Sequence, residues 1–600
     1  MNQNILIIAE KPSVGKAIAL ALDVNRKAGG YLYGNGYIIS WCFGHMLEFA
    51  SPESYDNRYD KWNLKDLPII PQVWKMKVMN GKGAQAELLK QLMHREDVAC
   101  VVNACDAGRE GELIFRNIYN YAGCTKPAKR LWISSMENDA IRDGFRNLRD
   151  SSEYDNLYAA ALCRARADWL VGINGTRFFS VLYHRPLAVG RVMTPTLAMI
   201  VQRENKISRF IPKPFYTVNA DCGGIVAVSD RFENREDAEN AVKSCTGKAL
   251  TVINTDMKKH CENPPRLYDL TSLQRDANRV LGFTAQQTLD YLQSLYENGL
   301  CTYPRTDSQY LTDDMEKNVS ELADIAAEIL HCEYVSEKNT KQVCSSKDVS
   351  DHHAIVPTTH FDNYSVDLLP LGEQEIMKLI CKRVLCAVSA PDEYEETSYE
   401  LQIGDLPFRA KESRVVDPGW RRFEDKKADE NEAPVLNNKG SLNDYELYIK
   451  EGSTSSAKHY TEDTLLAAME NAGRENMPAD AERRGLGTPA TRAAILEKLV
   501  STKFMERKKS GRIDRLMPSE SGNSIITVMP EELQSPLLTA QWESRLKAIE
   551  NGEERPEQFL TDITLMLEDL IAKYTPLQGA ADRRQTRFWF RPKAGLLYRC

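Results

Sequence analysis

Residues 5–13, Ile5-Leu6-Ile7-Ile8-Ala9-Glu10-Lys11-Pro12-Ser13, decide how the chain begins to fold. The apolar residues are typical of a strand, the polar residues after them of a loop, and the spacing of apolar residues from Val14 to Leu22 of a helix. The same order returns at Val98 to Ala104, which is followed by Asp106-Ala107-Gly108-Arg109-Glu110-Gly111-Glu112 and a second helical pattern. Two such units predict a parallel sheet whose loops gather at the carboxyl ends of the strands, where α/β proteins bind ligands.

The length and composition predict several domains. The chain has 600 residues, several times the length of one domain, and its 42% hydrophobic and 27% charged residues are typical of a globular protein. Residues 155–205 have a helical composition, and 461–571 are again helical. Between them, strand-like patterns at 215–228 and 394–403 flank a separate helical pattern at 272–296, and residues 424–442 are acidic and Asn-rich like a loop. One β region and one helical region are therefore each expected in two pieces.

The charge is unevenly distributed. The net charge of −8 argues against a protein that coats nucleic acid over its whole surface. Residues 161–213, however, carry nine Lys and Arg against two acids, 483–515 ten against three, and 583–599 six against none. These tracts indicate either a defined channel for a polyanion or ordinary solvated faces. The fourteen cysteines form no C-x-x-C pair, so neither a zinc ribbon nor a redox dithiol is predicted.

Gly15-Lys16 invites comparison with a phosphate-binding P-loop, but the motif fails. Glu10 stands where the first glycine is needed, and Ala17 stands where a Ser or Thr would hold magnesium. We therefore expect a reaction that needs no ATP.

Carboxylates follow both predicted strands. If the strands are neighbours, Glu10 and Asp106, with Glu110 and Glu112, converge on one crevice, and hard divalent cations such as Mg²⁺ prefer such oxygen ligands. Gly108 and Gly111 let the backbone pass close to a ligand, and Arg109 supplies a partner for phosphate. The alternative is a set of surface acids in a loop.

Together these residues resemble the toprim domain, a magnesium-binding fold shared by topoisomerases, primases and some nucleases. Its pattern is a Glu after the first strand and Asp-x-Asp after a later one. Here Asp106 is followed by Gly108 in place of the second Asp. The resemblance therefore implies metal binding by Glu10 and Asp106, with Glu110 or water completing the coordination.

A second segment separates the toprim families. Thr302-Tyr303-Pro304-Arg305-Thr306-Asp307 matches, residue by residue, the segment that carries the nucleophilic tyrosine of type IA DNA topoisomerases. The opening Ala-Glu-Lys-Pro-Ser and the segment Leu486 to Arg492 resemble the topoisomerase III kind. Further matches in chain order are Gly190 to Pro195, with Met193 in place of the usual Gln, and Asp351 to Pro357.

The chemistry of these residues agrees with that resemblance. A tyrosine phenol has a pKa of about 10, so a cation must favour its phenolate, and Arg305 can do so if strand alternation puts it on the same face as Tyr303. Glu10 is the expected general acid, with a pKa raised by nearby carboxylates. Lys11 is expected to hold the scissile phosphate, and His352 either contacts that phosphate or is an interior histidine.

The resemblance also implies a DNA path. Arg164 and Asp168, at i and i+4 on a helix, form either a structural ion pair or DNA contacts. Trp62 either stacks on a base or packs in a core. The residues that the resemblance implies as further DNA contacts are Trp169, Arg177, Ala188, Val189, Gly190, Arg191, Val192, Met193 and Arg305.

The fold class expected is multidomain α/β plus α and β, with a toprim domain, helical domains and a β-rich hinge domain in a ring. The expected boundaries are 1–150 for the toprim domain, 151–213 and 461–575 for a helical domain, 214–268 and 391–460 for the hinge domain, 269–390 for the domain with Tyr303, and 576–600 for a basic tail.

The resemblance implies a monomeric, ATP-independent enzyme that acts on single-stranded regions of DNA. It cleaves one strand through a 5′-phosphotyrosine, passes another strand and reseals the break, and so relaxes negative supercoils or decatenates DNA. No run approaches the ~18 to 20 apolar residues of a membrane span, so we expect a cytoplasmic, nucleoid-associated protein without membrane contact. The alternatives are a toprim nuclease or primase, and a non-catalytic subunit that binds single-stranded DNA.

Overall fold

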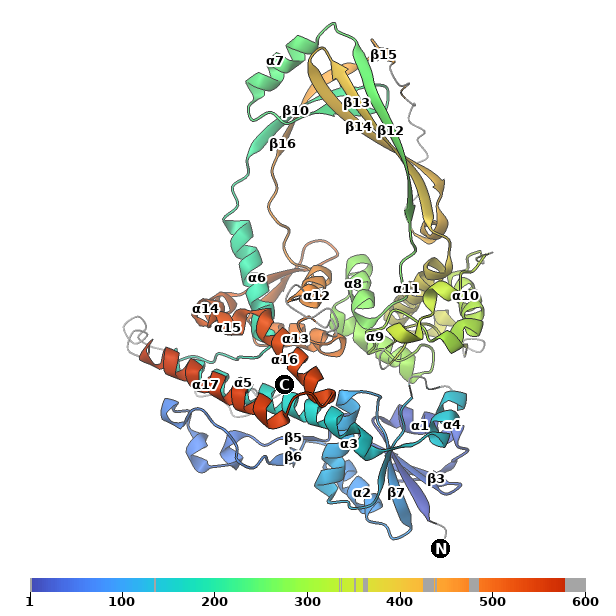
Figure 1. Ribbon diagram of the computed structural model, residues 1–600, viewed down its shortest axis with the longest axis vertical. Helices are drawn as coiled ribbons and strands as arrows, with labels where there is room; N and C mark the ends of the chain where they lie inside the picture. The colour runs from blue at the N-terminus through green and yellow to red at the C-terminus, as the bar shows by residue number, and fades with distance from the viewer. Residues whose placement is uncertain are drawn as a thin grey trace.

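The chain forms a ring, with an α/β domain at one end, a curved sheet at the other and helical domains between them (Figure 1). The computed structural model describes residues 3–133, 136, 138–333, 335, 337–349, 352–359, 365–424, 436, 440–473 and 485–577. The predicted basic tail lies outside these residues from 578 onward, as does most of the predicted loop at 424–442. Among the described residues, no helix has both the length and the apolar character needed to cross a membrane.

The first domain is built on the two strands expected from the sequence. β1 (Asn4–Ala9) and β7 (Val98–Ala104) pair in parallel, from Ile5 opposite Cys100 to Ala9 opposite Ala104. Leu6 and Ile8 belong to the core on one face of the sheet, and Ile7 and Ala9 to the core on the other. This alternation explains the continuous apolar run, because a strand covered on both faces has no solvent side.

The sheet of this domain is mixed, where the sequence pattern predicted a parallel one. Its order is β2-β3-β4-β1-β7-β8-β9, with parallel pairs in the centre and antiparallel strands at both edges. The remaining strands are β2 (Arg26–Ala28), β3 (Tyr31–Gly34), β4 (Tyr37–Trp41), β8 (Ala128–Arg130) and β9 (Arg149–Asp150), with a separate hairpin of β5 (Leu47–Phe49) and β6 (Met76–Val78). The helices are α1 (Pro12–Ala21), α2 (Gly83–Met93), α3 (Arg109–Ala122) and α4 (Asn138–Arg146).

A helical domain is assembled from two distant pieces of chain. α5 (Asp155–Leu182) and α6 (Met193–Ser208) share one hydrophobic core with helices from beyond residue 460. These are α12 (Glu462–Asn471), α13 (Pro489–Ser501), α14 (Glu520–Val528), α15 (Glu531–Gln534), α16 (Pro536–Glu550) and α17 (Pro556–Tyr574). The second piece also contains a hairpin, β17 (Met505–Lys508) and β18 (Arg515–Pro518), which the helical pattern did not predict.

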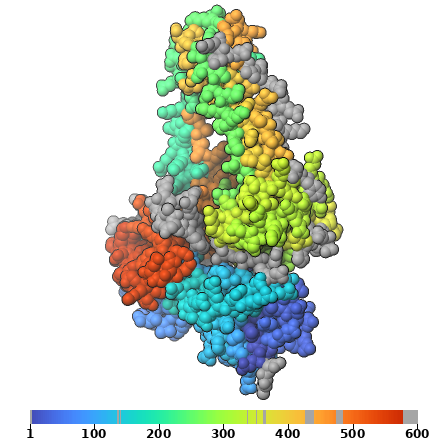
Figure 2. All heavy atoms as spheres, turned by 45° about the vertical axis from the view of Figure 1, so that its right-hand side comes forward, coloured from blue at the N-terminus to red at the C-terminus, as the bar shows by residue number. Residues whose placement is uncertain are grey.

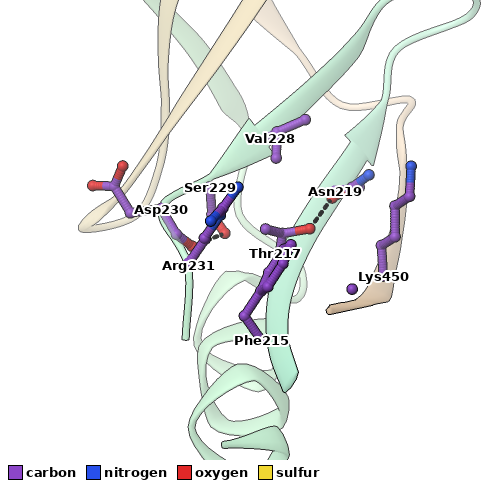
Figure 3. Close-up of a pocket in the computed structure, with 9 residues that line it drawn as sticks. Phe215, Thr217, Asn219, Val228, Ser229, Asp230, Arg231 and Lys450 are labelled. Carbon is purple, nitrogen blue, oxygen red and sulfur yellow. Dashed lines mark hydrogen bonds between the residues drawn. The ribbon is translucent and has the colours of Figure 1, made fainter. Parts of the chain in front are cut away.

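The hinge sheet also comes from two pieces of chain. It has seven antiparallel strands in the order β15-β12-β13-β14-β11-β10-β16. The strands are β10 (Pro214–Asp221), β11 (Val226–Ser229), β12 (Leu250–Glu262), β13 (Asp392–Ile403), β14 (Leu406–Asp417), β15 (Ser441–Leu442) and β16 (Glu446–Ser453), with α7 (Arg235–Cys245) beside them. A pocket of ≈ 640 Å³ on this sheet is lined by Phe215, Arg231 and Lys450, among others, and lies at the opposite end of the ring from the site described below (Figure 3).

Between the two halves of the hinge sheet, the chain forms a separate helical domain with its own core. Its helices are α8 (Leu270–Leu281), α9 (Ala285–Glu297), α10 (Glu316–Leu330) and α11 (Leu371–Val388). The single helical pattern at 272–296 is in fact two helices, because Gly282 ends α8 with a φ of 77° and the Thr284 hydroxyl caps α9. This domain, yellow-green in Figure 2, rests on the first domain, which is blue to cyan.

Candidate active site

Two carboxylates meet where the central parallel strands end. Glu10 follows β1 and is buried, and the backbone N–H of Asp106, in the loop after β7, lies 3.4 Å from Glu10 Oε2. Gly111 lets α3 begin directly under this loop, since a Cβ at that position would lie 2.1 Å from the Asp106 carbonyl oxygen. The convergence expected from the sequence is therefore present for Glu10 and Asp106.

Tyr303 reaches these carboxylates from the domain that rests on the first one. Its hydroxyl donates a hydrogen bond to Asp106 Oδ2 at 2.5 Å, and Lys11 Nζ lies 5.2 Å from the centre of its ring. The ring of His352 is 4.2 Å away, centre to centre, and that of Tyr296 is 5.4 Å away. Residues from both domains thus surround the tyrosine that the sequence singled out.

The segment that carries Tyr303 is an irregular loop, not the strand expected from the sequence. Hydrogen bonds to the neighbouring chain at 352–356 fix it: the Thr302 N–H donates to the Val356 carbonyl at 3.0 Å, and the Thr306 hydroxyl donates to the His352 carbonyl at 2.7 Å. Strand alternation therefore does not place Arg305 beside Tyr303. Its positive charge nevertheless acts on the phenol, because it opposes the rise in the pKa of Tyr303 that burial and the carboxylates cause.

Burial dominates the protonation of the site. It raises the pKa of Glu10 to about 7, helped by the charge of Asp106 and opposed by Lys11. The direction is the expected one, although burial outweighs repulsion between carboxylates. Burial, Asp106 and Glu10 also raise the pKa of Tyr303 well above its usual value, and Arg305 does not offset them. In this conformation Tyr303 keeps its proton, and Asp106 is the group placed to accept it.

Glu10 and Asp106 offer oxygen ligands to a hard cation. Asp106 Oδ1 is buried and makes no hydrogen bond, as expected of a ligand atom. Glu110 instead pairs with His45; burial would raise its pKa, but that hydrogen bond and the charges of His45, Arg164 and Arg109 lower it to about 2. Within the described part of the chain, no three His, Cys, Asp or Glu side chains form a metal-binding group. The donor set that fits a cation is thus a pair.

Glu112 is not part of this donor set. Its side chain is fully buried, accepts hydrogen bonds from Arg116 Nε and Asn103 Nδ2 at 2.8 Å each, and lies 3.4 Å from Arg130 Nε. Arg130, also fully buried, donates to the carbonyls of Cys105 and Asp106 at 2.6 Å. The predicted convergence is therefore wrong for Glu112, which holds an arginine that fixes the Asp106 loop.

The expected Arg164–Asp168 pair is replaced by other partners. Asp168 accepts a hydrogen bond from Arg191 Nε at 2.9 Å, and Arg164 Nε lies 3.8 Å from a carboxylate oxygen of Glu543 on α16. Arg191 is buried, with a further hydrogen bond to Glu543 at 3.2 Å. The guanidinium of Arg191, in the turn that begins at Gly190, therefore contacts acidic residues of its own chain.

Other residues implied as DNA contacts have structural partners as well. Arg177 is buried, donates to Glu53 at 2.6 Å and lies over the half-buried ring of Trp62, so a DNA contact would require this pair to open. Trp169 packs 5.3 Å from Trp74, ring centre to ring centre. In the Gly190 turn, Val189 and Met193 belong to the helical core, while Ala188 and Val192 pack against it. Their roles in DNA binding stay predictions.

Three residues of this region were not found from the sequence. His45 pairs with Glu110, Arg130 braces the Asp106 loop, and Glu543 joins an arginine cluster from far along the chain. A Gly-His pair after a strand is a signal that could have drawn attention to His45. Nothing local marks Arg130 or Glu543, whose partners lie 18 to 434 residues away.

Comparison with known proteins agrees with this fold and site. A family profile described as DNA topoisomerase matches residues 152–561, and one described as Toprim domain matches residues 5–136. The chain therefore belongs to the DNA topoisomerase family, as a type IA enzyme with a Toprim domain.

Among curated proteins, the chain is 38% identical to the DNA topoisomerase 3 of Bacillus licheniformis over 588 residues, 93% of this chain and 80% of that protein. It is 38% identical to the DNA topoisomerase 3 of Bacillus subtilis over 587 residues, with the same coverage. Full-length topoisomerase I from Thermotoga maritima shares the fold with a TM-score of 0.73 at 24% identity, covering 94% of this chain and 90% of that one.

Proposed function

We propose that Tyr303 cleaves one DNA strand and that the enzyme passes another strand through the break before resealing it. The observation that carries this proposal is the hydrogen bond from the Tyr303 hydroxyl to Asp106, across the contact between two domains and beside Glu10 and Lys11. A nucleophile on one domain that meets its proton acceptor on another suits strand passage, because the covalent bond to Tyr303 can hold the DNA end while the two domains separate.

The cleavage step balances with residues of this chain. The Tyr303 oxygen attacks the phosphorus, its proton passes to Asp106, and the bond from phosphorus to the sugar 3′ oxygen breaks. Glu10, whose pKa of about 7 keeps it partly protonated, donates a proton to that leaving oxygen. The product is a 5′-phosphotyrosine. One phosphoester replaces another, so the reverse step reseals the strand without ATP.

Three further side chains act in this mechanism, two on the phosphate and one on the nucleophile. Lys11 Nζ is buried without a hydrogen bond, 3.8 Å from Glu10, and is free to donate to a phosphate oxygen. Arg305 supplies positive charge near Tyr303, and His352 packs against the phenol and orients it. Such preorganised charge stabilises the transition state in a site from which water is excluded.

Mg²⁺ is the cofactor that we assign to Glu10 and Asp106. When bound, it supplies positive charge that helps to hold the broken ends for resealing. Glu110 would complete the set once it leaves His45, and water would do so otherwise. The unpaired, buried Asp106 Oδ1 supports this assignment.

The substrate that we assign is DNA with single-stranded regions, acted on by a monomer at the nucleoid in the cytoplasm, to relax negative supercoils or decatenate. The six positions of the tyrosine segment Thr302 to Asp307 favour this function over a toprim nuclease or primase, which needs no such segment. An intact Glu10, Tyr303 and Arg305 also favour it over a non-catalytic DNA-binding subunit.

The decisive experiment is incubation with single-stranded DNA, a denaturant quench, and a search for a covalent adduct. The adduct is expected on Tyr303 of the wild type. Tyr303→Phe should lose both the adduct and relaxation of supercoiled DNA while retaining single-strand binding, because only the nucleophilic oxygen is removed. A nuclease would still cut DNA as Tyr303→Phe, and a binding subunit would form no adduct even as wild type.

A further inference from the structure

A single carboxylate lies among three arginines beside the site. Glu543, on α16, is 11% exposed, and its oxygens lie 3.2 Å from Arg191 Nη1, 3.5 Å from Arg109 Nη1 and 3.8 Å from Arg164 Nε. The three arginines come from distant segments: the start of α3, the middle of α5 and the Gly190 turn. None of the mechanistic steps above uses Glu543.

The surroundings hold these guanidinium groups in fixed positions. Arg191 also donates to Asp168 at 2.9 Å and lies over the ring of Trp542, 5.2 Å from its centre. Arg109 Nε lies 3.7 Å from Glu550, which follows Glu543 by about two helical turns on α16. Several guanidinium groups directed at one pair of anionic oxygens is the arrangement that proteins use to bind a phosphate.

The three arginines already have acidic partners. Among the described residues, Glu543, Glu550 and Asp168 pair with them, and the charges of Arg164 and Arg109 also act on Glu110. A phosphate that binds these arginines must therefore take the place of a carboxylate, since a further anion among them would be repelled at short range. Glu543 is the acid that all three arginines share, so it is the one whose place a phosphate would take.

We propose that Glu543 is a positioning residue that stands in for a DNA phosphate: it holds the three arginines ready when no strand is bound and yields them to a phosphate when a strand enters. This inference rests on the proposed function, since it requires an enzyme that binds single-stranded DNA, and on the predicted DNA path that includes Arg164 and Arg191. It goes beyond that function because it assigns the control of DNA affinity to an acidic residue, Glu543, and not only to basic residues.

The exchange has a signature in salt dependence. Each phosphate neutralised on single-stranded DNA releases counterions and contributes a slope of ~0.7 to the fall of log K with log salt. In the wild type, the displaced Glu543 carboxylate regains a cation from solution, which offsets part of that release. Without its charge, strands should bind more tightly, and the slope should steepen by up to about 0.7.

The test measures the affinity of a fluorescent single-stranded oligonucleotide over a tenfold range of salt. All proteins carry Tyr303→Phe, so that no strand is cut. Glu543→Gln is compared with Glu532→Gln, which removes one charge from the same domain at an exposed pair with Lys573. We expect Glu543→Gln to bind more tightly at low salt, with an advantage that shrinks about fivefold over the range, since 10 raised to 0.7 is about 5. Glu532→Gln should match the parent protein.

Weaker binding by Glu543→Gln, or an unchanged slope, would overturn the proposal and leave Glu543 with a purely structural part. If Glu543→Gln does not fold, as judged by its thermal midpoint, Glu543→Asp takes its place. The shorter carboxylate keeps the charge but reaches the arginines less well, so intermediate tightening supports the proposal and weaker binding overturns it. Arg164→Ala separates this inference from the proposed function: if it leaves binding unchanged, the arginine cluster is off the DNA path and the inference fails, whereas covalent cleavage by Tyr303 is tested separately by the adduct.

Discussion

Replacing Glu112 by Gln should destabilise the loop that carries Asp106, because Glu112 is the ionic partner of Arg130, which holds that loop. Both carboxylate oxygens of Glu112 accept: one from Arg116, the other from Asn103, with Arg130 3.4 Å from the latter oxygen. Gln offers one acceptor and one donor, so its amide must turn N–H groups toward a donor on one side. Arg130 has no exposed surface and would keep its charge without an ionic partner.

The size of the effect follows from that burial. Removing one partner of a buried ion pair costs about 3–5 kcal/mol, because the other charge is left uncompensated. Since 1.4 kcal/mol is a factor of ten, protection of the β7 and α3 amides from hydrogen exchange should fall by roughly 10²-fold to 4 × 10³-fold. Exchange read by peptide is the suitable assay, because a multidomain chain has no single free energy of unfolding.

The matched control is Glu48→Gln, which removes a carboxylate from the same domain. Glu48 pairs with Lys77 at 3.2 Å with both side chains partly exposed, and such pairs contribute about 1 kcal/mol or less. Covalent adduct formation should fall for Glu112→Gln, since Arg130 anchors the Asp106 carbonyl, and should not change for Glu48→Gln. Unchanged protection of β7 in Glu112→Gln would refute the claim that this pair holds the loop.

Three further outcomes are expected. Arg305→Ala should raise the activation free energy of cleavage by about 2.7–4 kcal/mol if its charge acts as one oxyanion donor does, while single-strand binding is retained. Quench-flow measurement of the adduct tests this, and an unchanged rate would remove Arg305 from the chemistry. Gly108→Asp should lower the Mg²⁺ concentration needed for half-maximal relaxation, because it adds a carboxylate beside Asp106, and equal requirements would mean that Glu110 already serves. Asp269 caps α8, and burial raises its pKa to about 6, so its stabilising effect is present below pH ~4 and is lost as pH rises through 6. Asp269→Asn keeps an acceptor for the cap, so protection of the α8 amides from hydrogen exchange in the wild type should drop relative to this variant between pH 4 and 6, and a constant difference would contradict the assigned pKa.

Much of the fold was predictable, because its signals are local. The apolar run before Glu10 and the one before Asp106 each mark a strand, and parallel neighbours bring their carboxyl ends together. The break between α8 and α9 was also readable, since Gly282 and Thr284 are ordinary stop and start residues within a continuous helical period. The antiparallel edges of the first sheet carry no comparable signal.

The arrangement of the site was less predictable, because it depends on distant partners. Tyr303 meets Asp106 across 197 residues, and Arg191 meets Glu543 across 352. The resemblance implies Arg177 as a DNA contact, whereas its buried pairing with Glu53 could not be read from the sequence. Residue type gives the chemistry that a side chain can perform, whereas the packing of domains decides which partner it receives.

The shared core of the divided helical domain has a consequence for the synthesis of the protein. Val201 and Tyr460 belong to the same core, so the apolar faces of α5 and α6 leave the ribosome long before the helices that cover them. At about 5–20 residues per second, the ~260 residues between them take roughly 13 to 50 s to translate. The inserted domain of α8 to α11, with a core of its own, is complete before its predecessor in the chain. The order of folding on the ribosome therefore differs from the order of the sequence, and α5 and α6 are where a nascent-chain chaperone would be needed.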